Sequence, residues 1–273
     1  MTKSKFNING DAEAITIKKF SGGEVQVTVN RNFSNGYNVI HRLCVNAHIK
    51  DADGIIALMQ LKSILDTDYP HMEKSLELPY VPYARQDRSM GDGDAFSLKV
   101  FCNLLNSLKF DIVYITDPHS DVTPALIDNV VVRHQHSQMH VKNIYDAVVS
   151  PDGGALKKIY KVSERFNLPV IKADKVRDIK TGNITATEAH GNVTGLKLLI
   201  VDDIIDGGRS FTELAKVLKE KGASQVDLYI THGIFSKGVN VLREHIDKIY
   251  CLYAWSENLS ENTDSFVTDV YSF

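Results

Sequence analysis

The sequence has few of the features that mark secreted, membrane-spanning or disordered proteins. It contains only three cysteines, Cys44, Cys102 and Cys251, which are far apart and lie among apolar neighbours. This favours buried reduced thiols over disulfides or a metal site. No apolar run approaches the roughly 18 residues needed to cross a bilayer, and residues 1–20 lack the apolar core of a signal peptide. We therefore expect a cytoplasmic protein with no membrane partner.

Neither sign of charge dominates the chain. There are 31 Lys and Arg residues against 34 Asp and Glu, a formal net charge of −3, so no general positive field exists to attract nucleic acid. The hydrophobic fraction of 43% and the charged fraction of 24% are ordinary for a globular protein. These values exclude a disordered chain and a small disulfide scaffold, and 273 residues are enough for two domains.

Short apolar runs alternate with amphipathic segments of helical length. We expect strands near residues 15–17, 25–29, 76–81, 112–115, 130–132, 147–149, 170–171, 196–201, 226–230 and 249–252. We expect helices near residues 52–65, 96–108, 155–166, 210–221 and 239–245. This alternation predicts an α/β fold in which helices flank mainly parallel sheets. The polar stretch 134–140 is the best boundary, which gives two similar domains, 1–137 and 138–273, although the last residues could instead pack on the N-terminal domain.

The strongest chemical signal is the stretch LLIVDDIIDGGRSFTEL, residues 198–214. A buried strand runs into acids and glycines before a helix begins, so backbone N–H groups and a helix N-terminus become available to an anion. Adjacent carboxylates suit the two hydroxyls of a ribose, and Ser210 is a candidate N-cap. The predicted ribose-phosphate site comprises Asp202, Asp203, Asp206, Gly207, Gly208, Arg209 and Ser210.

This stretch resembles the phosphoribosyl-diphosphate motif of the type I phosphoribosyltransferase fold. Six other segments narrow the resemblance to the ribose-phosphate diphosphokinases, and within them to a short, virus-encoded type. These segments are FSGGE (20–24), PYARQD (82–87), DPHS (117–120), SPDGG (150–154), KVR (175–177) and THGIFS (231–236). The chain is thus identified as a member of that family. The resemblance implies two domains of the type I phosphoribosyltransferase fold.

The resemblance also implies an activity, namely ATP- and Mg²⁺-dependent transfer of diphosphate to the C1 hydroxyl of ribose 5-phosphate. It assigns ATP binding to Phe20, Glu24, Arg85, Gln86 and Asp87. It assigns catalysis to Lys175, Arg177 and His119, and Mg²⁺ binding to His119 and Asp152. The polar segment 178–192 would be a lid, and a homo-oligomer would share the adenine pocket between chains.

The chain departs from the family pattern at its phosphate loop, where Gly207 replaces a Thr whose hydroxyl normally holds the sugar 5-phosphate. The acceptor could therefore be ribose 5-phosphate or a larger 5-substituted ribose such as ADP-ribose, whose second phosphate Arg209 could reach. Two further hypotheses are a phosphoribosyltransferase, which would not need the 82–87 and 175–177 segments, and a non-catalytic regulatory homologue.

Overall fold

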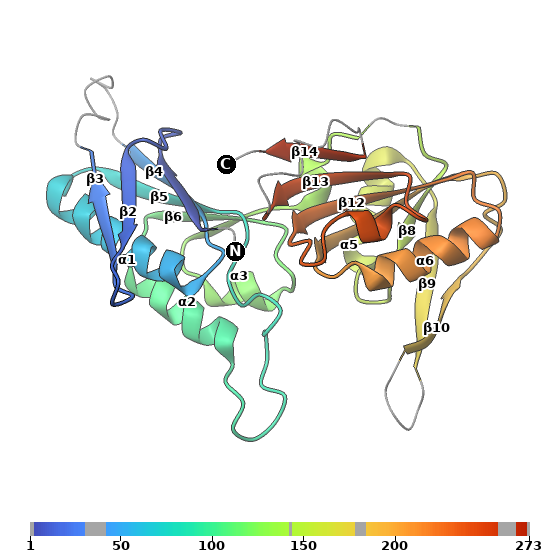
Figure 1. Ribbon diagram of the computed structural model, residues 1–273, viewed down its shortest axis with the longest axis horizontal. Helices are drawn as coiled ribbons and strands as arrows, with labels where there is room; N and C mark the ends of the chain where they lie inside the picture. Colours follow the sequence, from blue (N-terminus) through green and yellow to red (C-terminus); the bar gives the residue numbers. More distant parts are fainter. Residues whose placement is uncertain (1–2, 31–41, 142–143, 178–183, 256–265, 272–273) are drawn as a thin grey trace. The chain divides into compact units, whose positions relative to one another are not determined.

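The protein divides into two compact units, one up to His134 and one from Gln135. The computed structural model describes residues 3–30, 42–141, 144–177, 184–255 and 266–271 (Figure 1). The sequence-based boundary at residue 137 lies three residues further along. No helix in the described part of the chain is long and apolar enough to span a bilayer.

The N-terminal unit is built on a five-stranded sheet. Its elements are β1 (Lys5–Ile8), β2 (Ile15–Lys19), β3 (Val25–Val29), β4 (Arg42–His48), α1 (Ala52–Asp68), β5 (Glu73–Leu78), α2 (Ser97–Ser107), β6 (Ile112–Thr116), α3 (Val122–Leu126) and β7 (Val130–Arg133). The strand order is β1-β4-β5-β6-β7, in which β1 is antiparallel and the others are parallel. Buried residues of three neighbouring strands, Val45 of β4, Leu76 of β5 and Ile115 of β6, pack in one core. Leu58 of α1 and Phe101 of α2 belong to the same core.

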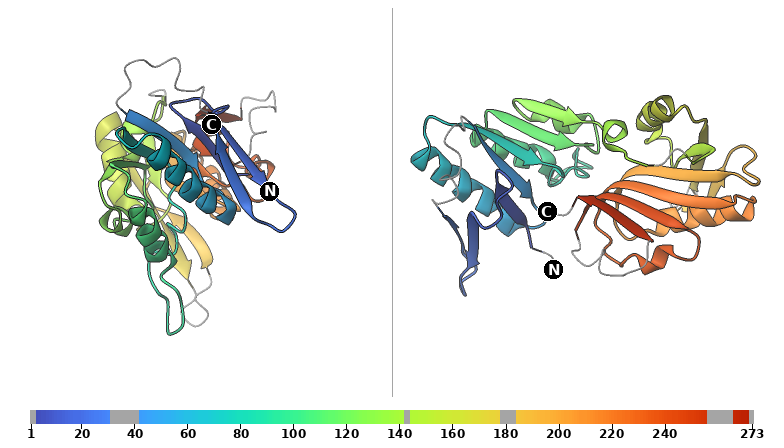
Figure 2. Two further views of the ribbon diagram at one scale, coloured as in Figure 1. Left: turned by 90° about the vertical axis from the view of Figure 1, so that its left-hand side faces the viewer. Right: turned by 90° about the horizontal axis from the view of Figure 1, so that it is seen from above.

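Strands β2 and β3 form a separate antiparallel hairpin beside α1, drawn in dark blue in Figure 2. The amide of Gln60 on α1 ties the hairpin to the helix, because it donates to the carbonyl of Val25 and accepts from the N–H of Val27. The paired strands predicted at 15–17 and 25–29 are confirmed.

The C-terminal unit is built on a seven-stranded sheet. Its elements are α4 (Gln135–Gln138), β8 (Ala147–Ser150), α5 (Leu156–Phe166), β9 (Val170–Arg177), β10 (Ile184–Ala189), β11 (Lys197–Ile205), α6 (Arg209–Glu220), β12 (Gln225–Gly233), the 3-10 helix η2 (Asn240–Leu242), β13 (Lys248–Ala254) and β14 (Val267–Tyr271). The order is β10-β9-β8-β11-β12-β13-β14, and only β10 runs antiparallel to its neighbour.

Side chains that alternate along β11 bury both faces of this sheet. Leu198 and Ile200 pack in the cluster that contains Leu214 of α6, whereas Leu199 packs with Ile159 of α5. A parallel strand that is covered on both faces reads as a continuous apolar run, which is why residues 198–201 were recognised as a buried strand. The predicted α/β class with mainly parallel sheets is confirmed.

Some details of the prediction differ from the structure. Strand β11 continues through Asp202 and Asp203 to Ile205, instead of ending at residue 201, because β12 pairs with it as far as Ile205. The helix predicted at 239–245 was wrong, since only the short turn η2 forms there. The chain end forms β14 beside β13, and residues 272–273, part of the segment that could have packed on the N-terminal domain, lie outside the described residues.

Candidate functional site

The two acids of the predicted ribose site lie at the carboxyl end of β11, the edge where parallel α/β sheets bind ligands. The Asp203 N–H donates to Asp202 Oδ1 at 2.9 Å. Asp203 is buried, and its Oδ2 lies 3.2 Å from the ammonium of Lys158 on α5. Lys158 was not predicted, because its contact joins residues 45 positions apart in the chain.

This corner of the protein holds more negative than positive charge. Loss of water around the carboxyl, and then repulsion from Asp203 and more weakly from Asp152, raise the pKa of Asp202 well above its ordinary value, although the Asp203 N–H opposes this. Excess carboxylate charge would be relieved by hydroxyl donors or by a cation. The arrangement therefore suits a polyhydroxylated ligand together with a divalent metal ion.

A buried side-chain amide hydrogen-bonds to the backbone of Asp202, the first of the two acids. Gln135 of α4 is 3% exposed, and its Nε2 donates to the Asp202 carbonyl at 2.6 Å and to Thr231 Oγ1 of β12 at 3.1 Å. Gln135 therefore links β11 to β12 where both approach their carboxyl ends. No sequence pattern pointed to this residue, since a single Gln in a polar stretch carries no signal of its own.

The loop that follows β11 turns at Gly208, whose φ of +81° belongs to the left-handed region. A Cβ at this position would also lie 2.9 Å from Leu242 Cδ2, so that side chain would have to shift, and both features favour glycine. Gly208 is the N-cap of α6, so the prediction that Ser210 caps this helix was wrong. The backbone N–H groups of residues 207–210 donate to no acceptor in the described part of the chain.

Arg209 lies on the exposed side of α6. Its Nε is 2.7 Å from Glu213 Oε1, one helical turn further on, and its side chain is 86% exposed. The guanidinium is thus paired along the helix surface. The hypothesis that it reaches a second phosphate gains no support from this geometry.

Asp152 shapes the loop between β8 and α5. Its Oδ1 accepts the N–H groups of Gly154 at 3.0 Å and Ala155 at 3.2 Å, while Ser150 Oγ donates to the Asp152 carbonyl at 2.8 Å. These contacts hold the predicted metal ligand at the carboxyl end of β8. Among the described residues no group of three or more His, Cys, Asp or Glu is arranged as a metal site.

In the N-terminal unit, two predicted segments meet around Asp87. The guanidinium of Arg88, whose Nε lies 2.8 Å from Asp87 Oδ1, is the main cause that lowers the pKa of this carboxyl. Ser120 and His119 contribute in the same direction, against the opposing effect of burial. The PYARQD and DPHS segments are thus neighbours, and the Asp87 carboxyl joins them.

Arg85 and Gln86 are exposed on the same loop. The Gln86 N–H donates to the Tyr83 carbonyl at 2.8 Å, and the Gln86 carbonyl accepts from Leu98 N in the first turn of α2. Tyr83 has a φ of +64°, an uncommon value for a bulky residue that tends to occur at functional loops. The loop is therefore held against α2 with both predicted ATP-binding side chains outward.

Phe20 and Glu24 flank the tight turn of the β2–β3 hairpin. The Phe20 N–H donates to the Glu24 carbonyl at 2.9 Å, which closes the turn. The Phe20 ring is 44% exposed, with the Lys18 ammonium 4.8 Å from its centre. An exposed aromatic at a hairpin turn is available to stack on a planar ligand.

The KVR segment lies on β9, which pairs with β10 as an antiparallel hairpin. The side chains of Lys175 and Arg177, and residues 178–183 of the predicted lid, lie outside the described residues. At the hairpin base, His190 Nε2 is 2.8 Å from Asp174 Oδ2. The two predicted catalytic residues are thus placed by their backbone alone.

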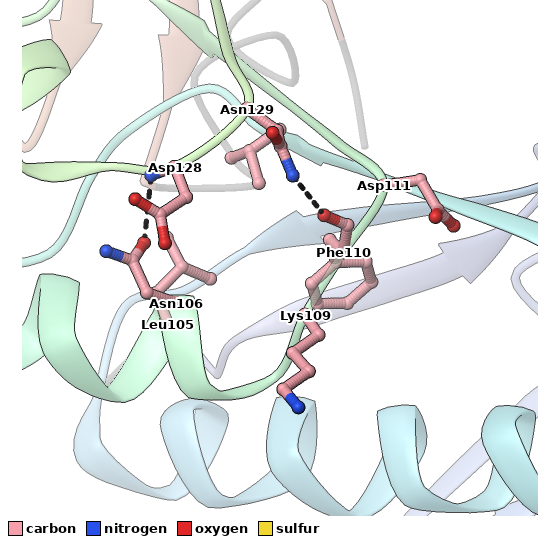
Figure 3. Close-up of a pocket in the computed structure, with 8 residues that line it drawn as sticks. Leu105, Asn106, Lys109, Phe110, Asp111, Asp128 and Asn129 are labelled. Atoms are coloured by element: carbon pink, nitrogen blue, oxygen red, sulfur yellow. Dashed lines mark hydrogen bonds between the residues drawn. The ribbon is translucent and has the colours of Figure 1, made fainter.

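A cavity of about 240 Å³ lies in the N-terminal unit at the amino ends of the sheet strands, on the side opposite to their carboxyl ends (Figure 3). Phe110 and Asp111 precede β6, and Asn129 precedes β7, so this cavity faces the amino ends of the strands. None of the predicted site residues lines it. It is therefore separate from the candidate site.

Comparison with known proteins decides the family. A ribose-phosphate pyrophosphokinase from Agrobacterium fabrum is 31% identical over 232 residues, which cover 82% of this chain and 73% of that protein. The chain belongs to the ribose-phosphate pyrophosphokinase family. A family member from Pyrococcus abyssi is 28% identical over 235 residues, which cover 84% of this chain and 80% of that protein.

Two further comparisons agree with this membership. The model of the phosphoribosyl transferase domain matches residues 130–260. A phosphoribosylpyrophosphate synthetase from Mycobacterium smegmatis has the same fold, with a TM-score of 0.74 and 22% identity over 94% of this chain and 85% of that one. The resemblance drawn from separate short segments is confirmed, as is the predicted fold.

Proposed function

We propose that this member of the pyrophosphokinase family transfers the diphosphoryl group of ATP to the C1 hydroxyl of ribose 5-phosphate. The anomeric oxygen bonds to the β-phosphorus, the bond from that phosphorus to the α,β-bridging oxygen breaks, and AMP leaves. The hydroxyl proton is lost. The observation that carries this proposal is the acid pair Asp202–Asp203 beside the unsatisfied N–H groups of residues 207–210, in a chain of this family.

The C-terminal unit would bind the acceptor. The carboxylates of Asp202 and Asp203 would accept hydrogen bonds from the ribose hydroxyls, and the ion pair with Lys158 would hold Asp203 in place. The N–H groups of Gly207 to Ser210 would surround the 5-phosphate, where the α6 dipole favours an anion. Asp206, which directly precedes Gly207, would be the third acid of this ribose-phosphate site.

ATP would be bound by residues of the N-terminal unit. Phe20 would stack on adenine, and Glu24 would accept from its amino group. Arg85 and Gln86 would donate to phosphate oxygens, while Asp87, held by Arg88, would orient the loop.

Lys175, Arg177 and His119 would serve the transfer itself. Phosphoryl transfer depends on cations placed around the equatorial oxygens of the moving group, and two cationic residues on one strand supply such charge. If their contacts form mainly in the transition state, they raise kcat more than they tighten binding.

The residues present fit a magnesium ion. Mg²⁺ takes oxygen ligands and keeps several waters, so few protein ligands are needed. The repulsion that Asp203 and Asp152 exert on Asp202 is the feature of this structure that a divalent cation would relieve. Asp152 and His119 would hold the ion, which when bound neutralises charge on the phosphate oxygens.

The decisive assay offers the protein ATP, Mg²⁺ and one acceptor at a time, and measures AMP by mass spectrometry. The acceptors are ribose 5-phosphate, ADP-ribose and unphosphorylated ribose, with a no-acceptor control. AMP that appears with ribose 5-phosphate supports the proposal. ADP that appears in place of AMP excludes diphosphoryl transfer and indicates transfer of a single phosphoryl group. No acceptor-dependent turnover also excludes the proposal and favours a non-catalytic role.

We also propose a homo-oligomer in which the hairpin turn with Phe20 and Glu24 completes a neighbour's adenine pocket. The exposed position of the Phe20 ring supports this. Sedimentation velocity at assay concentration tests it. A fully active monomer would show that the pocket is complete within one chain.

A further inference from the structure

The turn that follows β12 is anchored beside the phosphate loop. The Ile234 N–H donates to the Ile205 carbonyl at 2.8 Å, on the last residue of β11. Phe235 is 6% exposed, and Gly238 N donates to its carbonyl at 2.8 Å, which closes the turn. Phe235 also has a φ of +50°, a strained value for an aromatic residue. Packing and hydrogen bonds together hold this turn in one conformation.

This anchored turn places Lys237 across Gly207. A Cβ built on Gly207 would lie 3.7 Å from both Cδ and Cε of Lys237. The alkyl chain of the lysine therefore lies along the glycine face of the loop, next to the N–H groups of residues 207–210. A Cβ at position 207 would stand in ordinary van der Waals contact with the lysine, so glycine at this position leaves the backbone beneath the alkyl chain uncovered.

The ammonium of Lys237 has no acceptor among the described residues. Other cations near the loop are already paired, Lys158 with Asp203 and Arg209 with Glu213. A lysine held against a loop of unsatisfied N–H groups adds a full positive charge to donors that already favour an anion. No sequence pattern points to Lys237, because the THGIFS match ends at Ser236.

We propose that Lys237 binds the phosphate on O5 of the acceptor sugar and replaces the hydroxyl that Gly207 lacks. This inference rests on the proposed function, because it assigns a ligand to the same loop. The glycine lacks the neutral hydroxyl donor, and the lysine beside it supplies a cationic donor for the same phosphate. A charge-assisted hydrogen bond from an ammonium to a phosphate dianion is stronger than the neutral one from a hydroxyl.

The test compares Lys237→Met with the wild type. Methionine keeps an apolar chain over Gly207 and removes only the charge, so folding is preserved. We expect the KM for ribose 5-phosphate to rise about 10- to 100-fold, as for the loss of a charge-assisted contact, while the KM for ATP changes less than about threefold. Lys237→Arg keeps the charge and should restore most of the affinity.

The matched control is Lys216→Met, which removes an exposed lysine of α6 that faces Glu220. It should leave both KM values unchanged. Calorimetric titration with ribose 5-phosphate and with ribose supplies a readout that needs no turnover. The wild type should bind the phosphorylated sugar more tightly, and Lys237→Met should lose most of that difference.

Each outcome decides a separate question. An unchanged KM and an unchanged titration with Lys237→Met overturn the inference, even if the enzyme makes AMP. If Lys237→Met loses affinity for ADP-ribose but not for ribose 5-phosphate, the assignment of Lys237 to a terminal phosphate is overturned. If the wild type forms no AMP with any acceptor, the proposed function fails, and the titration still shows whether Lys237 binds a sugar phosphate.

Discussion

The ammonium of Lys158 lies 3.2 Å from Oδ2 of Asp203 and links α5 to the carboxyl end of β11. The Asp203 side chain is 8% exposed and the Lys158 side chain 29%, so water screens this pair only in part. Asp202 lies next to the pair, with its pKa already raised by its surroundings. Lys158 thus places a positive charge against Asp203, the neighbour that repels Asp202.

Lys158→Met should weaken acceptor binding. Without the cation, the negative charge of Asp203 is no longer offset, so the already raised pKa of Asp202 rises further. We expect the KM for ribose 5-phosphate to increase about tenfold and the acidic limb of the pH profile of kcat/KM to move to higher pH. Steady-state kinetics across pH 5–9 measure both effects.

Lys161→Met is the control for this change, because Lys161 lies on the same helix, is 64% exposed and faces Glu164. It should give the wild-type profile. If Lys158→Met leaves the acidic limb and the KM in place, the ion pair has no part in acceptor binding.

Lys175→Ala should lower kcat much more than it changes either KM. Loss of a contact made mainly in the transition state costs roughly 2–4 kcal/mol, a fall in kcat of about 30- to 1,000-fold. Single-turnover measurements with saturating ATP and acceptor would isolate the transfer step. A raised KM with an intact kcat would assign Lys175 to ground-state binding and refute the catalytic role.

Gly208→Ala should destabilise the C-terminal unit. Alanine is strained at the left-handed φ of +81°, and its Cβ would approach Leu242 Cδ2 to 2.9 Å. The two effects together should lower the free energy of unfolding by about 1–3 kcal/mol. Urea denaturation gives the value, and Gly91→Ala, where a Cβ meets no atom within 4 Å, should change it little. Equal stabilities would show that the loop adjusts freely.

Asp227 should make stability depend on pH. It is fully buried on β12, where loss of hydration raises its pKa above 3.8, although hydrogen bonds from Tyr145 and Gln225 oppose the shift. The folded state therefore retains a proton that the unfolded state has released. The free energy of unfolding falls as pH rises from about 4 through the raised pKa, by at most about 1.4 kcal/mol per pH unit.

Asp227→Asn isolates this contribution. Asparagine keeps the size of the side chain and an oxygen that accepts from Tyr145, but it cannot ionise. Denaturation curves at several pH values should lose the corresponding slope in the variant. A slope that persists unchanged would assign the pH dependence to other groups.

The sequence predicted what depends on local pattern. Alternation of apolar residues located most strands, and the run of acids and glycines after residue 201 located the ribose loop. It could not show that β11 continues to Ile205, since that depends on pairing with β12, or that Gly208 and not Ser210 caps α6. It also could not identify Gln135, Lys158 and Lys237. Each of them contacts Asp202, Asp203 or Gly207 across 30 or more positions of the chain, and a local pattern does not reveal such contacts.

The most direct test of the account follows the β-phosphorus of ATP. The protein is incubated with Mg²⁺, ribose 5-phosphate and ATP labelled at the β-phosphorus, and the products are separated. The account predicts that all the transferred label appears in a sugar that carries a 1-diphosphate, together with unlabelled AMP in equal amount. Label in ADP or in free diphosphate, with no labelled sugar, would contradict it.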